Sequence, residues 1–190
     1  VLHMQYSDAE KKAFGRKTYQ EEISYIVRHE QRNKFIRNLA LAQKGNTLVL
    51  FNLVETHGKV LYEGMKGKEH VHFVYGATSA EQREEIRGIV DNSISSTTIA
   101  SYGTFSTGIN IRNINNIVLA SPSKSKIRVL QSIGRGLRTS SSKDSILVFD
   151  IADDISYKGR YNFTLNHFFE RLNIYNEEQF NYEISKVKIK

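Results

Sequence analysis

The sequence contains no cysteine, which excludes a disulfide-stabilised scaffold and any metal site built from thiolates. It also has no apolar run approaching the ~20 residues that cross a bilayer. The N-terminal residues lack the basic start and the long apolar core of a secretory signal. These absences favour a reducing compartment without a membrane partner, and we expect a cytoplasmic location.

Acidic residues are absent from the central stretch between Asp91 and Asp144. Seven basic residues lie in this stretch, and their summed charge equals the formal net charge of the whole chain, +7. They are Arg112, Lys124, Lys126, Arg128, Arg135, Arg138 and Lys143. Ordinary surfaces intersperse charges of both signs. An unopposed basic stretch therefore favours a polyanion such as nucleic acid as partner, with a merely solvated basic face as the alternative.

Two nucleotide-binding motifs are also missing. There is no G-x-x-x-x-G-K-[ST] loop, because residues 64–68 have neither its spacing nor its Ser/Thr. Gly134 and Gly136 do not continue into a dinucleotide fingerprint, because Thr139 occupies the position of its third glycine. By itself, the chain lacks both of these standard means of holding a nucleotide.

Short apolar runs alternate with amphipathic segments along the 190 residues, a length sufficient for one good core. The expected strands cover residues 47–51, 70–75, 97–101, 116–120 and 145–150. The expected helices cover residues 18–27, 35–44, 54–66 and 79–90, and a further helix carries the arginines near residue 135. This alternation predicts an α/β fold with a parallel sheet and helices on both faces.

The chain is expected to divide into three parts. Residues 1–45 form an N-terminal segment and helices that pack on the core, and residues 46–155 form the core domain. Residues 156–190 form an aromatic-rich C-terminal extension with a helix around residues 165–175. We favour docking of this helix on the sheet over a platform for stacking bases.

Ligands of parallel α/β sheets gather at the carboxyl ends of the strands. Chemistry is therefore expected in the loops after Phe51, Tyr75, Ser101 and Ala120. Residues 101–110 read as a loop rich in glycine and hydroxyl groups, which can donate hydrogen bonds to phosphate or ribose oxygens. His57 is interpreted as a polar loop residue rather than a catalytic one.

Gln131, Arg135 and Arg138 are spaced so that they share one face of the expected helix. Guanidinium groups are always charged and present a planar fork of donors that suits phosphate oxygens. This face could therefore hold a polyphosphate whose charge shifts during reaction. A surface helix that merely carries two arginines is the alternative.

The pattern Q-x-x-G-R-x-x-R at residues 131–138 resembles the last signature motif of superfamily 2 helicases. Two further segments resemble motifs of this family: Ser101 followed by Gly108-x-Asn110, and a strand with the Gly76 turn followed by Arg83. In order and spacing, residues 47–150 resemble the second RecA-like domain of such a helicase.

The resemblance implies an ATP-dependent DNA helicase or translocase that remodels branched DNA in recombination, repair and replication. Arg138 would be the arginine finger, assisted by Arg135 and Gln131, with Gly108 and Asn110 beside the nucleotide. The residues implied to hold the DNA backbone are Gly76, Ser101, Tyr102, Thr104 and Asn52.

The implied cofactor is ATP with Mg²⁺, whose phosphate-binding lysine and metal ligands would belong to a first RecA-like domain outside this chain. That domain and branched or junction DNA are the expected partners. The chain alone should not hydrolyse ATP, and in a phage-encoded protein it would act in the host cytoplasm. A non-catalytic basic module that binds nucleic acid remains the main alternative, and a small-molecule α/β enzyme is a fainter one.

Overall fold

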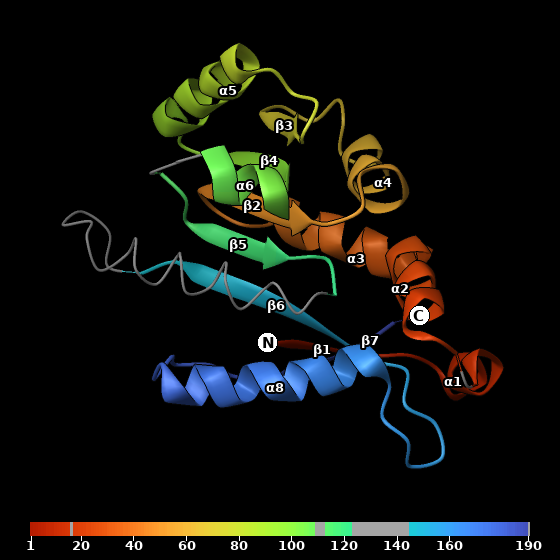
Figure 1. Ribbon diagram of the computed structural model, residues 1–190. Coiled ribbons are helices and arrows are strands. Elements are labelled where there is room, and N and C mark those ends of the chain that lie inside the picture. The colour runs from red at the N-terminus through yellow and green to blue at the C-terminus, as the bar shows by residue number, and fades with distance from the viewer. Residues whose placement is uncertain (16, 109–112, 123–144, 190) are drawn as a thin grey trace.

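The computed structural model describes residues 1–15, 17–108, 113–122 and 145–189. In these ranges seven parallel strands form one sheet in the order β3-β4-β2-β5-β6-β1-β7 (Figure 1). The strands are β1 (Leu2–Gln5), β2 (Asn46–Phe51), β3 (Val71–Val74), β4 (Ser96–Ser101), β5 (Asn116–Leu119), β6 (Leu147–Asp154) and β7 (Ser185–Lys188). The helices are α1 (Asp8–Phe14), α2 (Tyr19–Arg28), α3 (Glu30–Leu41), the π-helical turn η1 (Val54–Gly58), α4 (Lys59–Glu63), α5 (Ala80–Asn92), α6 (Tyr102–Gly108) and α8 (Phe163–Glu177).

Alternate residues of the central strand β2 pack on opposite faces of the sheet, as the two-residue period of a strand requires. Val49 and Phe51 join a core cluster with residues of α1, α2, α3 and α4. Leu48 and Leu50 join a second cluster with residues of α5, α6 and α8. The α/β fold with helices on both faces is thereby confirmed, and Figure 1 shows the two helical layers.

Two of the expected helices begin at capping boxes with the pattern Ser/Thr-x-x-Glu/Gln. The Thr18 side chain accepts a hydrogen bond from the Glu21 amide, and the Glu21 carboxylate accepts one from the Thr18 amide at 2.8 Å. Ser79 and Gln82 repeat this arrangement at the start of α5. Each box satisfies amide groups that the first helical turn leaves without intrahelical partners.

The structure corrects two expected elements. The helix expected over residues 54–66 is a π-helical turn followed by the short helix α4, which ends at Glu63. The loop expected after β4 is instead the helix α6, which begins directly at Tyr102. Glycine and hydroxyl residues have low helix propensity, but tertiary packing overrides such local preferences.

Two strands at one side of the sheet do not follow from the sequence pattern. β1 pairs with both β6 and β7, so the N-terminal and C-terminal strands lie side by side and parallel in the sheet. Both strands have only four residues, and β7 is the mostly exposed Ser-Lys-Val-Lys segment. Four residues are too few to show the alternation of apolar and polar residues that identifies a strand. The lysines of the edge strand β7 oppose its pairing with other chains.

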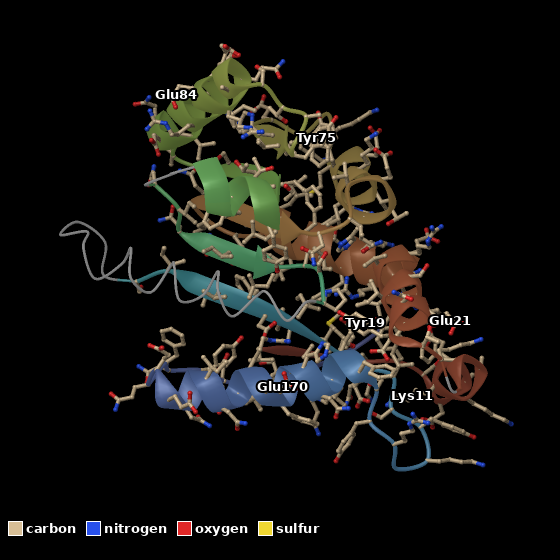
Figure 2. The ribbon with its side chains drawn as sticks, in the orientation of Figure 1. Lys11, Tyr19, Glu21, Tyr75, Glu84 and Glu170 are labelled. Carbon is tan, nitrogen blue, oxygen red and sulfur yellow. The ribbon has the colours of Figure 1, made fainter. Side chains whose placement is uncertain are left out.

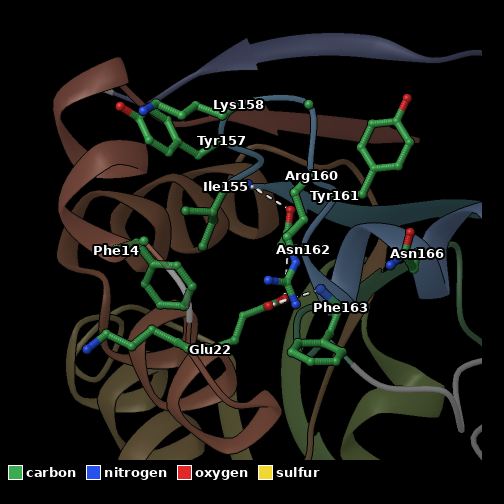
Figure 3. A pocket seen from close by; sticks show the side chains of 13 residues that line it. Phe14, Glu22, Ile155, Tyr157, Lys158, Arg160, Tyr161, Asn162, Phe163 and Asn166 are labelled. Atoms are coloured by element: carbon green, nitrogen blue, oxygen red, sulfur yellow. Dashed lines mark hydrogen bonds between the residues drawn. The ribbon is translucent and has the colours of Figure 1, made fainter.

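The C-terminal helix α8 is fastened to the N-terminal helix α2 through Glu22, which is 1% exposed. The Glu22 carboxylate accepts a hydrogen bond from the Phe163 amide at 3.0 Å (Figure 3). It accepts a second from the Thr164 amide at 2.7 Å. It also accepts one from the Asn162 side chain at 2.9 Å. An anionic group thus caps the positive end of the α8 dipole from a distant part of the chain.

We expect Glu22→Gln to lower the free energy of unfolding by about 1 to 3 kcal/mol, because buried hydrogen bonds to a charged acceptor are lost. The amide of glutamine also brings donors toward the α8 amides. Urea-induced unfolding measures the change. Glu30→Gln removes the same charge at an exposed position and should stay within about 0.5 kcal/mol of the wild type. Equal stability of the two variants would show that Glu22 is not a significant cap.

Candidate ATP and nucleic-acid edge

Four loops with polar residues meet at one edge of the sheet, because their strands are consecutive neighbours. The order β3-β4-β2-β5 places the residues after Val74, Ser101, Phe51 and Leu119 side by side. Phe51 pairs with Ser101 and Val74 with Ala100, so these strands end almost level. The expected clustering at the carboxyl ends of the strands is present in the structure, and we call this rim the carboxyl edge.

Gly76 follows β3 and is exposed in the turn that leads into α5. Its carbonyl accepts a hydrogen bond from Arg83 Nη2 at 3.1 Å, and the Tyr75 amide donates to Thr78 Oγ1 at 3.1 Å. A Cβ atom at Gly76 would meet no atom within 4 Å. Packing within the described part of the chain therefore gives no reason for glycine here, and the turn leaves room for a partner to approach the backbone.

The turn after β4 uses its hydroxyl groups internally. Ser101 Oγ and Thr104 Oγ1 lie 2.7 Å apart, and the Thr104 amide donates to Ser101 Oγ at 3.2 Å, which caps the first turn of α6. The Ser101, Tyr102 and Thr104 side chains are all buried, whereas Gly103 is exposed. Burial raises the pKa of Tyr102, and the charge of Asp150 raises it further. These side chains support the turn, which presents Gly103 outward.

Asn52 directly follows β2 and is exposed. Its amide donates to Ser121 Oγ at 3.0 Å, and the same hydroxyl lies 2.9 Å from Nδ1 of His57. His57 is fully buried in η1, so its interpretation as a loop residue is wrong. Ser121 was not among the expected site residues, although it follows β5 as Asn52 follows β2.

The residues expected to contact the nucleotide are only partly within the described ranges. Gly108 is the last residue of α6. Asn110, Gln131, Arg135 and Arg138 lie outside the described residues, as does the expected arginine helix. The described chain does reach the carboxyl edge on either side of the segment 109–112, because α6 begins at this edge and β5 ends there at Leu119.

No group of three His, Asp or Glu side chains in the described ranges is arranged to hold a metal ion. The same ranges hold no helix with the length and apolar character needed to cross a membrane.

The family model "Helicase conserved C-terminal domain" matches residues 30–140. The chain is 37% identical over 202 aligned residues to "ATP-dependent DNA helicase uvsW" of Enterobacteria phage T4, covering 99% of the chain and 40% of that protein. The crystal structure of T4 UvsW matches with a TM-score of 0.86 over all of this chain and 41% of that one. The chain thus spans about two fifths of the length of its phage relative.

Two more distant structures share the fold. The yeast DEAD-box splicing factor Prp28 matches with a TM-score of 0.60 at 16% identity, over 97% of this chain and 34% of that one. The Sulfolobus solfataricus SWI2/SNF2 ATPase core domain matches with a TM-score of 0.58 at 16% identity, over 95% and 43% of the two chains. From the model match and the phage relative together, we conclude that the chain belongs to the family of helicase conserved C-terminal domains.

Proposed function

We propose that this chain is the C-terminal motor domain of an ATP-dependent DNA helicase or translocase that remodels branched DNA in recombination, repair and replication. The observation that supports this most strongly is the carboxyl edge, where loops from neighbouring strands converge. It occurs in a chain that is similar over 99% of its length to a phage ATP-dependent DNA helicase. In this proposal, the edge faces a first RecA-like domain of the same longer protein across a cleft.

ATP supplies the free energy of the proposed motor when its γ-phosphoryl group is transferred to water. On this side of the cleft, Gly108 and Asn110 would approach the nucleotide. Arg138 would stabilise the negative charge that develops on the phosphoryl oxygens, assisted by Arg135 and Gln131. The first domain would contribute the phosphate-binding lysine and the Mg²⁺ ligands, so the present chain should be inactive alone.

The DNA track would use the loops of β2, β3 and β4. Gly76, Asn52 and Gly103 are exposed there, whereas Ser101, Tyr102 and Thr104 would act by holding the β4 turn in shape. Exposed backbone amides can contact phosphates closely where the side chain is only hydrogen. Such contacts position DNA without reading its sequence, so a preference for branched DNA would depend on shape.

The proposal is tested by comparing DNA-stimulated ATP hydrolysis in the longer parent protein and in the 190-residue chain. We expect hydrolysis by the parent and none by the chain, while the chain keeps measurable affinity for DNA. An inactive parent that still binds DNA would contradict the motor function. It would instead favour a non-catalytic basic module that binds nucleic acid.

A further inference from the structure

A tight turn follows β6 and presents basic side chains to solvent. The Tyr157 amide donates to the Arg160 carbonyl at 3.2 Å, and the Arg160 amide donates to the Tyr157 carbonyl at 3.1 Å. Lys158 and Gly159 between them have φ values of 50° and 75°. Positive φ at both central residues is the signature of a type I′ turn, in which lysine is an unfavourable choice compared with asparagine or glycine. Lysine at the tip thus suggests a role beyond folding.

The base of this turn is held rigidly by Asn162. Its Oδ1 accepts from the Ile155 amide at 3.0 Å, and its Nδ2 donates to Glu22 at 2.9 Å and to the Asp153 carbonyl at 3.1 Å. Figure 3 shows the first two of these bonds below the turn. Because both sides of the turn are anchored, Lys158 and Arg160 start from a fixed backbone and lose less freedom when they bind a partner.

Cations and aromatic rings gather around this turn. A cavity of about 680 Å³ is lined by the turn together with Lys17, Tyr161 and Phe163. Figure 3 shows Tyr161 and Phe163 beside the turn. Tyr161 is 58% exposed and Phe163 is 39% exposed. Tyr19, which is labelled in Figure 2, lies at the start of α2. Its ring centre is 6.0 Å from that of Phe163, so it adds to the aromatic residues near the turn.

The charge of the cavity rim is positive. Among the residues that the structure describes, Lys158 and Arg160 form no ion pair, and Lys17 has only an exposed one with Glu21 at 4.0 Å. Glu22 also lines the cavity, but its carboxylate is buried and accepts three hydrogen bonds from the α8 end. The accessible groups are therefore cations and ring faces, which together fit a strand of phosphates and unpaired bases.

We propose that the Tyr157–Arg160 turn and the rings of Tyr161 and Phe163 form a second contact site for single-stranded nucleic acid. Lys158 and Arg160 bind backbone phosphates there, and the rings stack on bases. The site follows β6 and so lies beyond the β3, β4 and β2 loops of the proposed track, at the same edge of the sheet. It rests on the proposed function, in which single strands leave a branched substrate.

The test measures binding of a fluorescein-labelled oligodeoxythymidine of about 20 nucleotides to the 190-residue chain, without ATP, by fluorescence anisotropy over a range of salt concentrations. Lys158→Asn with Arg160→Gln removes two charges and keeps the turn, because Asn-Gly is the preferred type I′ pair. We expect at least about a tenfold loss of affinity. The slope of log affinity against log salt should fall by about 1.4, or about 0.7 for each lost phosphate contact.

Lys34→Ala with Lys44→Ala is the matched control. Both lysines are exposed and lie outside the Tyr157–Arg160 turn, and the two substitutions together remove the same charge as the turn variant. This control should keep the affinity within about threefold and leave the salt slope unchanged. Tyr161→Ala should weaken binding by about tenfold through lost stacking, whereas Tyr161→Phe should keep it. This pair separates stacking from a role of the hydroxyl group.

Equal losses in the turn variant and the control would overturn the proposal, and so would a wild-type chain that does not bind the oligonucleotide. A turn variant that binds the oligonucleotide normally but no longer binds a separately produced first RecA-like domain would also overturn it, in favour of a protein contact. Failure of the motor function appears differently, as absent ATP hydrolysis by the parent protein with oligonucleotide binding by this chain intact.

Discussion

Asp153→Ala is expected to lower the free energy of unfolding by about 3 to 5 kcal/mol, because it leaves the Arg32 guanidinium charged and buried without its counter-ion. Both side chains are 0% exposed. Arg32 Nε donates to Asp153 Oδ1 at 2.6 Å, and Nη2 donates to Oδ2 at 2.9 Å. Water could not replace the carboxylate in this bidentate ion pair unless the core opened.

The pair also connects α3 and β6 to the carboxyl edge at the residue that follows β5. Arg32 belongs to α3 and Asp153 to β6. Arg32 Nη2 donates a further hydrogen bond, at 2.8 Å, to the carbonyl of Ala120, the residue directly after β5. Tyr6 donates from its hydroxyl to Asp153 Oδ1 at 2.9 Å. Burial and the Asp153 charge raise the pKa of Tyr6 well above its usual value, so this hydroxyl remains a donor.

Urea unfolding of the 190-residue chain measures the effect, with Asp8→Ala as an exposed control that should change stability by less than about 0.5 kcal/mol. Removing both charges with Arg32→Met and Asp153→Leu should recover most of the loss, because no unpaired charge then remains. A small effect of Asp153→Ala would show that Arg32 reaches water or another acceptor. It would thereby contradict the role of this pair in holding the end of β5.

Local sequence signals predicted local structure well. The capping boxes at Thr18 and Ser79 are contained in four consecutive residues, so their geometry does not depend on the rest of the chain. The strand over residues 47–51 could be recognised because both its faces are apolar. In a parallel sheet the carboxyl ends of the strands lie at one edge whatever the strand order, which is why the carboxyl edge was predictable.

Partners distant in the chain were not predictable from the sequence. Glu22 and Thr164 are 142 positions apart, and Arg32 and Asp153 are 121 apart. No periodicity and no motif in the sequence links the two partners of either pair. A single glutamate or arginine in an amphipathic helix is normally predicted to be exposed. The strands β1 and β7 depend on the same kind of information, because each is defined by its neighbours rather than by its own four residues.

At the candidate site, the positions of the residues were predictable but the burial of their side chains was not. The expected residues Gly76, Ser101 and Asn52 do lie on neighbouring strand ends, as the topology requires. The sequence could not indicate that the Ser101 and Thr104 hydroxyls bond each other and are buried. A hydroxyl-rich segment after a strand is equally suited to cap a helix and to bind a phosphate, and only packing decides between them.

Arg138→Ala in the longer parent protein is expected to reduce DNA-stimulated ATP turnover by about 10³- to 10⁵-fold, the range seen for arginine fingers in nucleotide hydrolases. The expectation follows from its spacing with Gln131 and Arg135 in the stretch of sequence that connects β5 to β6. DNA affinity should change little, because the finger acts on phosphoryl charge. Steady-state ATP hydrolysis and DNA binding, measured on the same preparation, separate the two effects.

Two matched variants sharpen this test. Arg138→Lys keeps the charge but loses the planar fork of donors, so most of the turnover should still be lost. Lys143→Ala removes one charge from the same acid-free stretch and should keep turnover within a few-fold of the wild type, because it lacks the finger's spacing. If Arg138→Ala and Lys143→Ala behave alike, the arginine acts only as part of a basic surface. The chain would then be better explained as a nucleic-acid-binding module than as half of an ATP-driven motor.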